Sequence, residues 1–241
     1  MCIRDRSPIA VAIDTTIYLN TAGNASVTSF EIGSGSSDNC AIVSYSLSDS
    51  TFNCADTGAN SVTMTVVDAS GNQSNASAII TVLDTIAPTA IAQNLTVYLN
   101  ASGQATINSS QINNGSNDNC SFVTLSLNDS LFDCADLDSA SVILTATDGS
   151  GNSHSDTATI TVLDTIAPSV FAFDTVDVYL NAAGVANIVP SMVDSASADA
   201  CGIDTMYLDS TSFACSNLGS PITVTLSVVD SSGNIGTATS I

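Results

Sequence analysis

Oxygen-bearing side chains are the residues of this chain whose types and spacing could do chemistry. Residues 148–152, Asp-Gly-Ser-Gly-Asn, place such side chains at the first, third and fifth positions, as calcium-binding loops begin. Glycine at the fourth position and the lack of a glutamate at the twelfth exclude an EF-hand. The pattern is also typical of a tight turn between two strands, with a left-handed glycine. A calcium site and a structural turn are therefore both open interpretations.

A repeat of about 80 residues runs through the chain. Residues 83–88, Leu-Asp-Thr-Ile-Ala-Pro, recur at residues 163–168, and Asp68, Asp148 and Asp230 each open the pattern Asp-x-Ser-Gly-Asn. Such self-similarity indicates tandem modules joined by Asp-Thr-Ile-Ala-Pro linkers. The third module lacks the Thr-Val-Leu-Asp end of the others, so we expect the chain to be part of a longer array. The modules cover residues 7–87, 88–167 and 168–241.

Each module contains segments in which inward apolar residues alternate with other residues. Val62, Met64 and Val66, separated by threonines, show the period-two pattern that predicts a half-buried strand. Several short strands within about 80 residues are typical of a β-sandwich. We predict an all-β fold of three tandem immunoglobulin-like β-sandwich domains in an extended array. The same alternation is found at Val142, Leu144 and Ala146, at Val224, Leu226 and Val228, and at Ala158, Ile160 and Val162.

The sequence Tyr-Leu-Asn occurs once in each module and is followed by a glycine. Residues 98–103 predict a strand that runs into a hairpin turn, in which Gly103 supplies a positive φ. The equivalent tyrosines are Tyr18 and Tyr179.

An immunoglobulin-like fold would bring acids of neighbouring modules together at each joint. Its first strand begins at the end that carries the B–C and F–G loops, so the linker acid would lie beside acids of the next module. Three or four oxygen ligands could hold a hard cation such as Ca²⁺, since residues 7–241 contain no lysine or arginine to balance them. The predicted ligands are Asp84, Asp118, Asp148 and Asn152 at the first joint, and Asp164, Asp199, Asp230 and Asn234 at the second.

Six of the seven cysteines form three pairs, each with a spacing of 14 residues and each in the same place in its module. We predict that each module closes its own disulfide, because the repeat favours one pairing over the other possibilities. A metal site competes with this interpretation, but neither histidine nor Cys-x-x-Cys accompanies the pairs. Persistent disulfides predict an extracellular or cell-surface location. The predicted pairs are Cys40 with Cys54, Cys120 with Cys134, and Cys201 with Cys215.

The charge of the chain excludes several classes of function. It contains 23 acidic and only two basic residues, for a formal net charge of −21. Such a chain cannot neutralise phosphates, which excludes nucleic-acid binding. An anionic membrane surface would repel it, and no apolar run approaches the ~18 residues of a membrane span. We therefore expect no direct membrane insertion.

Residues 1–6 match nothing in the repeat and hold both basic residues, Arg4 and Arg6, together with the unpaired Cys2. We interpret this segment as a scar of translated adapter sequence and leave it out of the fold. The alternative is a real tail with a reactive thiol.

Three motifs of the second module resemble the hyalin repeat (HYR) family: residues 145–152, 158–162 and 164–168. The resemblance extends over residues 7–241 in three copies. It implies an immunoglobulin-like fold and a role in adhesion, and bacterial versions occur in long secreted or surface proteins. Many members carry a cysteine in the last strand, where this chain has residues such as Ala76 and Ala158. The chain is therefore similar to a variant branch.

Catalysis is not expected, because His154 is the single histidine and no insertion interrupts the repeat. We expect a non-catalytic extracellular adhesion or spacer array, whose surface partner is an unidentified glycan or protein. The alternative is a set of glycan-binding accessory modules of a secreted polysaccharide-active enzyme, in which the recurring tyrosines would stack on sugars.

Overall fold

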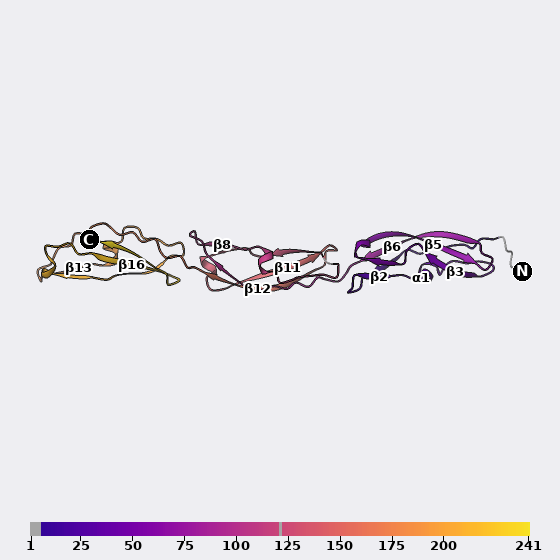
Figure 1. Cartoon of the computed structure of the whole chain (residues 1–241), viewed down its shortest axis with the longest axis horizontal. Coiled ribbons are helices and arrows are strands. Elements are labelled where there is room, and N and C mark those ends of the chain that lie inside the picture. Colours follow the sequence, from indigo (N-terminus) through magenta and orange to yellow (C-terminus); the bar gives the residue numbers. More distant parts are fainter. Residues whose placement is uncertain (1–5, 121) are drawn as a thin grey trace. The chain divides into compact units, whose positions relative to one another are not determined.

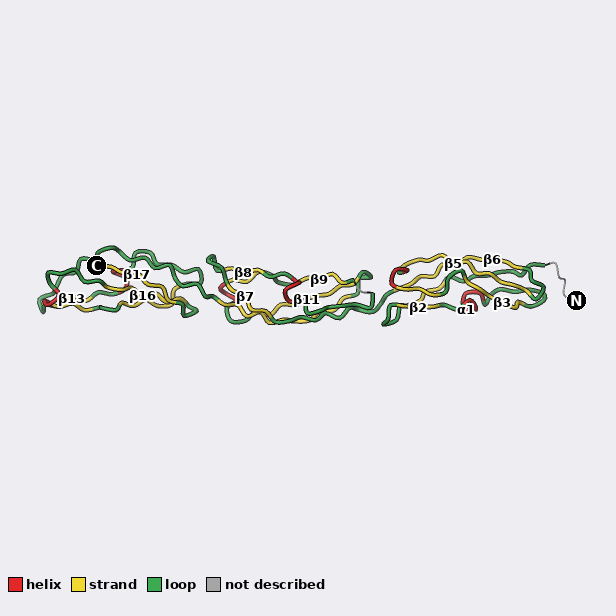
Figure 2. Tube along the Cα trace, viewed as in Figure 1, coloured by secondary structure: helices red, strands yellow, loops and turns green. Residues whose placement is uncertain are grey.

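The computed structural model describes residues 6–120 and 122–241, so the interpretation of residues 1–5, Cys2 included, lies outside the described residues. The elements of the first repeat are β1 (Thr15–Tyr18), β2 (Asn24–Ser26), α1 (Ser29–Gly33), β3 (Ile42–Leu47), β4 (Thr51–Asn53), the 3₁₀ helix η1 (Cys54–Asp56), β5 (Gly58–Asp68) and β6 (Gln73–Leu83). Figure 2 shows that strands and loops dominate and that helices are short.

The same order of elements recurs along the chain. The second repeat contains β7 (Leu95–Tyr98), β8 (Gln104–Thr106), α2 (Ser109–Ile112), β9 (Val123–Leu127), β10 (Leu131–Asp133), η2 (Cys134–Asp136), β11 (Ala140–Asp148) and β12 (Ser153–Leu163). The third contains β13 (Val185–Asn187), α3 (Pro190–Val193), β14 (Ile203–Leu208), β15 (Ser212–Ala214), η3 (Cys215–Asn217), β16 (Val224–Asp230) and β17 (Ile235–Ser240).

Two sheets make up the first repeat. One has the strand order β1-β6-β5-β3 and the other pairs β2 with β4. The long hairpin of β5 and β6 is visible in Figure 1, and β1 lies parallel to β6, with Thr15 opposite Ile80 and Tyr18 opposite Leu83. A parallel edge strand beside an antiparallel sheet, with a second sheet behind it, is an immunoglobulin-like β-sandwich. The second repeat has the corresponding orders β7-β12-β11-β9 and β10-β8.

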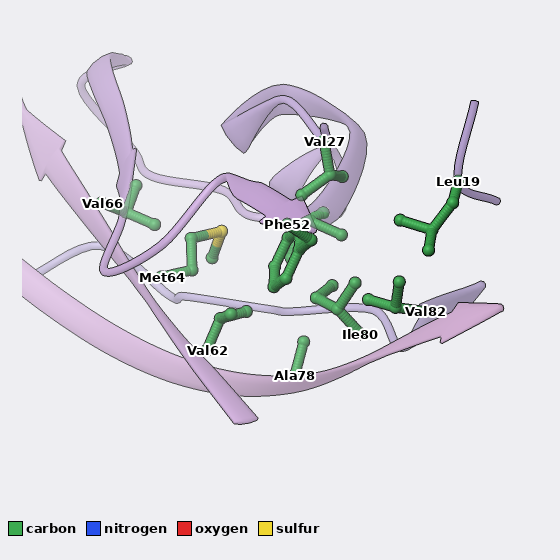
Figure 3. Close-up of a cluster of buried hydrophobic side chains, with 10 residues drawn as sticks. Leu19, Val27, Phe52, Val62, Met64, Val66, Ala78, Ile80 and Val82 are labelled. Atoms are coloured by element: carbon green, nitrogen blue, oxygen red, sulfur yellow. The ribbon is translucent and has the colours of Figure 1, made fainter. Parts of the chain in front are cut away.

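The alternating residues point into the core, as predicted. Val62, Met64 and Val66 of β5 are at most 1% exposed, because a strand presents every second side chain to the same face. Figure 3 shows the ring of Phe52, from β4, reaching toward Val62 and Ile80 of the opposite sheet. The predicted inward residues of β11, β12 and β16 are likewise buried. The all-β, tandem β-sandwich fold is confirmed.

The chain divides into two compact units. One comprises the residues up to Ala92 together with Asn113–Ser126 and Leu144–Asp156; the other comprises Gln93–Ile112, Leu127–Ile143 and Thr157–Ile241. The second repeat contributes to both units, so each unit contains one junction between consecutive repeats. The boundaries at residues 87 and 167 remain a prediction.

The segment at residues 98–103 differs from the prediction in one respect. Gly103 has the expected positive φ of 69°, and its N–H donates to the Asn100 carbonyl. The flanking strands are not a hairpin, because β7 pairs with β12 and β8 pairs with β10. The turn therefore carries the chain from one sheet to the other. In the described part of the chain, no helix has the length and apolarity needed to cross a bilayer.

Candidate metal sites at the junctions between repeats

A disulfide links the two repeats at each junction. Cys54, which begins η1, is bonded to Cys120, which precedes β9, with a Cα–Cα distance of 5.4 Å. Cys134 of η2 is bonded in the same way to Cys201, with a Cα–Cα distance of 5.2 Å. The second cysteine of one repeat thus binds the first cysteine of the next.

The predicted pairing within each repeat is wrong. Cys40 is disulfide-bonded, but its predicted partner Cys54 pairs with Cys120; Cys215 is a free, exposed thiol. The physical reason is distance along the sandwich. The six residues of β3 separate Cys40 from the β4 end of the repeat, and six strand residues rise by about 20 Å, far beyond the reach of a disulfide.

A glycine in the turn before the second strand makes room for each of these cysteines. Gly23 has a φ of +72°, and a Cβ atom on it would lie 2.7 Å from the Cys54 sulfur. Gly103 has a φ of +69° and would meet the Cys134 sulfur at 2.8 Å. Any other residue would strain the backbone and collide with the disulfide. The recurring glycine of the sequence is therefore part of the junction.

At the first junction the structure brings two of the four predicted ligands together. Carboxylate oxygens of Asp84 and Asp118 and the Cys120 sulfur lie within 4.8 Å of one another, and Asp84 is only 6% exposed. The sulfur belongs to a disulfide, so it is not a thiolate ligand. Asp118 accepts a hydrogen bond from the Cys120 N–H at 2.8 Å, which holds the acid beside the disulfide.

Asn119 lies between these two carboxylates. One end of its side-chain amide is 3.3 Å from Asp84 Oδ1, and the other end faces Asp118 Oδ1 at 3.0 Å. Because an amide has only one donor end, it can satisfy one carboxylate while its oxygen faces the other. An amide oxygen and a carboxylate oxygen that face each other without a proton between them favour a cation. Asn119, which stands between Asp118 and Cys120, was not among the predicted ligands.

The second junction repeats this arrangement with one change. Asp164, Asp199 and the Cys201 sulfur offer atoms within 4.8 Å of one another, beside a cavity of about 350 Å³ lined by both acids. The position of Asn119 is taken by Ala200, which has no amide. Asp164 Oδ1 accepts from the Ile166 N–H, whereas Asp164 Oδ2 is buried without a hydrogen-bond partner. Among the described residues, only Ser240 Oγ is another such buried side-chain atom.

The four other predicted ligands lie in the turns between the last two strands of each repeat. Asp148 Oδ1 accepts from the N–H groups of Ser150 and Asn152, and Asp148 Oδ2 accepts from Asn152 Nδ2. Asn152 Nδ2 also donates to the main-chain oxygen of Asp84 at 3.1 Å. Asp230 and Asn234 make the same contacts, with Asp164 as the linker residue. These residues build the turn and tie it to the linker.

The equivalent turn of the first repeat contains Asp68. Burial raises the pKa of this carboxyl, but hydrogen bonds from Asn72, Ser70 and Gly71 outweigh burial and hold the pKa below its ordinary value. Asn72 Nδ2 donates to the main-chain oxygen of Arg6, as its counterparts do to the linkers.

The recurring tyrosines lie at the surface. Tyr18 and Tyr98 end the edge strands β1 and β7 and are 60% and 61% exposed. His154, the single histidine, is exposed, and its Nδ1 accepts from the Ala90 N–H at 3.1 Å.

Comparison with known proteins identifies no family. No family model matches the chain, and no curated protein matches it. Among solved structures, the chain is similar to PcdhgB3 EC1-4, with 13% identity over 98% of this chain and 75% of that chain and a TM-score of 0.39. The corresponding values for mouse Cadherin-23 EC22-24 are 13%, 98%, 98% and 0.36. For the human Desmocollin-1 ectodomain they are 11%, 99%, 58% and 0.27. At TM-scores this low the similarity assigns no function, and the fold rests on the strand order described above.

Proposed function

We propose that this chain is a non-catalytic, extracellular adhesion or spacer array in which a calcium ion binds at each junction between repeats. The observation that supports this most directly is the pair of acids at each junction, Asp84 with Asp118 and Asp164 with Asp199. Each pair lies beside a disulfide that already joins the two repeats.

The oxygen atoms at the junctions suit Ca²⁺ better than a softer metal. Calcium takes six to eight oxygen ligands, from carboxylates, amide and main-chain carbonyls and water. Asp84, Asp118 and the oxygen of Asn119 supply three at the first junction. At the second, Asp164 Oδ2 is a buried acceptor that lacks a donor. Since residues 7–241 contain no lysine or arginine, a bound cation is the available means of neutralising these acids.

The remaining features fit an extracellular spacer. The disulfides favour an oxidising compartment, and the cross-links between repeats limit the freedom of each joint. Repulsion among acids keeps such an array soluble. The resemblance to hyalin repeats supports an adhesive role, with a protein or a glycan as the surface partner.

Calcium titration of the thermal unfolding tests the proposal. We expect Ca²⁺ at 100 times its dissociation constant to stabilise the protein by about 2.7 kcal/mol, and Mg²⁺ to have a smaller effect. The double variants Asp84→Asn/Asp118→Asn and Asp164→Asn/Asp199→Asn should each lose the response of one junction. Asp204→Asn, which changes an exposed acid of β14, should keep both responses. If Ca²⁺ leaves the unfolding temperature of the parent protein unchanged, the proposal is wrong.

The glycan-binding alternative depends on the exposed tyrosines. Tyr18 and Tyr98 present their rings to solvent at equivalent edge positions, and a ring of this kind can stack on a sugar. Affinity electrophoresis in gels that contain a polysaccharide tests this role. Retardation that Tyr18→Ser and Tyr98→Ser abolish would support glycan binding, and equal migration in all gels would exclude it for the polysaccharides used.

A further inference from the structure

Both disulfides end on one short stretch of the second repeat. Cys120, where the stretch begins, is bonded to Cys54 of the first repeat, and Cys134, where it ends, is bonded to Cys201 of the third. Cys120 and Cys134 are only 14 residues apart in the sequence. We call residues 120–134 the covalent bridge. Through this bridge and the two disulfides, the first repeat is joined to the third by a short covalent path that does not depend on the folding of the second.

The corresponding segment of the first repeat, residues 40–54, runs along the repeat without turning back. Its strand β3 is antiparallel to β5, and β5 is antiparallel to β6, which ends at the linker. Strand β3 therefore runs toward the junction with the second repeat. Strand β4 is antiparallel to β2, which leads away from the junction turn at Gly23, so β4 runs toward the junction as well. Both strands advance in one direction, and Cys54 follows at the junction.

The covalent bridge has little length to gain when it is pulled. Its strands β9 and β10 contribute five and three residues. A strand residue already rises by about 3.3 Å, against at most about 3.6 Å in a fully stretched chain. The whole bridge therefore reaches no further than about 50 Å, whereas a repeat of about 80 residues would reach about 290 Å on unfolding.

Most of the second repeat lies in loops that the disulfides close. The bonded cysteines are 66 and 67 residues apart in the sequence. Tension on the array enters the second repeat at Cys120 and leaves it at Cys134, so the bridge becomes taut before either loop is loaded. The hydrogen bonds that hold the loops in the sandwich are therefore protected, because the shortest covalent path carries the tension.

Main-chain hydrogen bonds fix both ends of the covalent bridge. At its beginning, Asp118 Oδ2 accepts from the Cys120 N–H at 2.8 Å. At its end, Cys134 opens η2, where Asp136 Oδ2 accepts from the Asp133 N–H at 3.0 Å and the Asp133 side chain accepts from the helix main chain. This reciprocal pair is a capping box. Each end of the bridge is thus held by hydrogen bonds within a few residues of its cysteine.

We propose that this array is a load-bearing tether, in which tension passes from repeat to repeat through the disulfides and the covalent bridge. The second repeat can then lose its fold under tension without lengthening the array by more than the slack of the bridge. Such a spacer keeps its reach when its surface partner is pulled away. The inference rests on the proposed spacer role, but it does not depend on calcium binding.

Single-molecule stretching of the oxidised full chain tests the tether. Handles are attached through non-natural side chains at positions 55 and 204, which are exposed and lie close in sequence to Cys54 and Cys201. The parent chain should become taut at about 75 Å, because the covalent path runs through the bridge. Cys134→Ser/Cys201→Ser should become taut at about 310 Å. Cys215→Ser removes a thiol outside this path and should keep the length of the parent.

A second measurement needs no variant and shows whether the disulfides carry the load. The parent chain is held at constant force in dithiothreitol, whose thiolate attacks one sulfur, forms a mixed disulfide and releases the other sulfur as a thiolate. Each broken bond frees one loop, so the contour length should increase in two steps of about 230 Å. The rate of these steps should rise with the applied force, since the sulfur–sulfur bond lengthens as it breaks.

Two results would overturn the inference. An oxidised parent chain that extends well beyond about 75 Å would show that the second repeat itself lies in the load path. A reduction rate that does not change with force would show that the disulfides carry no tension. Both measurements are made in a chelator, so their outcome is separate from that of the calcium titration.

Discussion

The two junctions of this chain have the same disulfide and the same pair of acids, but they differ at the residue between the acid and the cysteine. Asn119 places an amide next to Asp84 at the first junction. At the second junction Ala200 offers no amide, and Asp164 Oδ2 is buried and unpaired. Both linker acids accept a main-chain N–H at Oδ1, from Ile86 and from Ile166, so the junctions differ in the added amide and in the unpaired Oδ2.

The disulfide and the acids contribute to each junction in different ways. The disulfides close loops of nearly equal length, since the bonded cysteines are 66 and 67 residues apart. The acids, and the residue between acid and cysteine, add an electrostatic contribution to the stability that the covalent link provides. We therefore expect the covalent contribution to be equal at the two junctions and the electrostatic contribution to differ.

The largest effect should come from removing a disulfide. Closing a loop of 66 or 67 residues stabilises the folded protein by about 4 kcal/mol, mainly by restricting the unfolded chain. Cys54→Ser/Cys120→Ser and Cys134→Ser/Cys201→Ser should each lose this amount in the unit that contains the bond. Hydrogen exchange, resolved by peptide, measures both losses, and Cys215→Ser, which removes the free thiol, should lose nothing. Unequal losses would show that the junctions differ in more than their electrostatics.

A smaller effect of opposite sign is expected for Asp164→Asn without calcium. The substitution replaces a buried, unpaired carboxylate oxygen and removes its repulsion with Asp199, so it should stabilise the second junction by roughly 1–2 kcal/mol. Asp84→Asn at the first junction should stabilise less, because Asp84 has no buried carboxylate oxygen that lacks a hydrogen-bond partner. Thermal unfolding in a chelator compares the two variants, and the comparison fails if Asp84→Asn stabilises as much as Asp164→Asn.

Exchanging the residue between the acid and the cysteine should make the stabilities of the two junctions more alike. Asn119→Ala removes an amide donor and should cost about 1 kcal/mol, and Ala200→Asn adds a donor near Asp164 and should recover about the same amount. Calcium titration of both variants sharpens the test. We expect the calcium response of the first junction to decrease in Asn119→Ala, because the variant lacks one of the three oxygen ligands, and no change in either response would contradict the role given to this position.

Low pH should weaken the Asp-x-Ser-Gly-Asn turn of each repeat. Asp68, in the turn of the first repeat, is the residue with which to test this. Its folded pKa lies below the ordinary value of 3.8, so ionised Asp68 stabilises the fold above that pH. The contribution is lost as the pH falls below 3.8 and through the lower folded pKa. The parent protein should unfold at a higher temperature than Asp68→Asn at pH 7, and the gap should close toward pH 2. A gap that stays constant with pH would exclude an ionised Asp68 as its cause.

Much of the fold could be predicted because strand patterns are local. The alternation at Val62, Met64 and Val66 placed each of these side chains in the core, and the left-handed glycine of the Asp-x-Ser-Gly-Asn turn has a φ of +91° at Gly151. The role of Asn152 was less accessible, because its contact with the Asp84 carbonyl joins residues 68 positions apart.

The disulfide pairing could not be predicted from the local sequence. The equal spacing of 14 residues favoured one bond per repeat, but spacing does not show that the two cysteines lie at opposite ends of a sandwich. The recurring Gly23 could have indicated a close approach, since its place before the second strand is conspicuous, although no sequence pattern names the sulfur that it contacts.

The sequence by itself determined the repeat, the alternation of its strands, the excess of acids and the absence of basic residues from 7–241, because these are properties of residue types and of short-range order. The tertiary structure decided which cysteines bond and which acids converge. Those outcomes depend on the end of the sandwich at which residues far apart in the sequence meet.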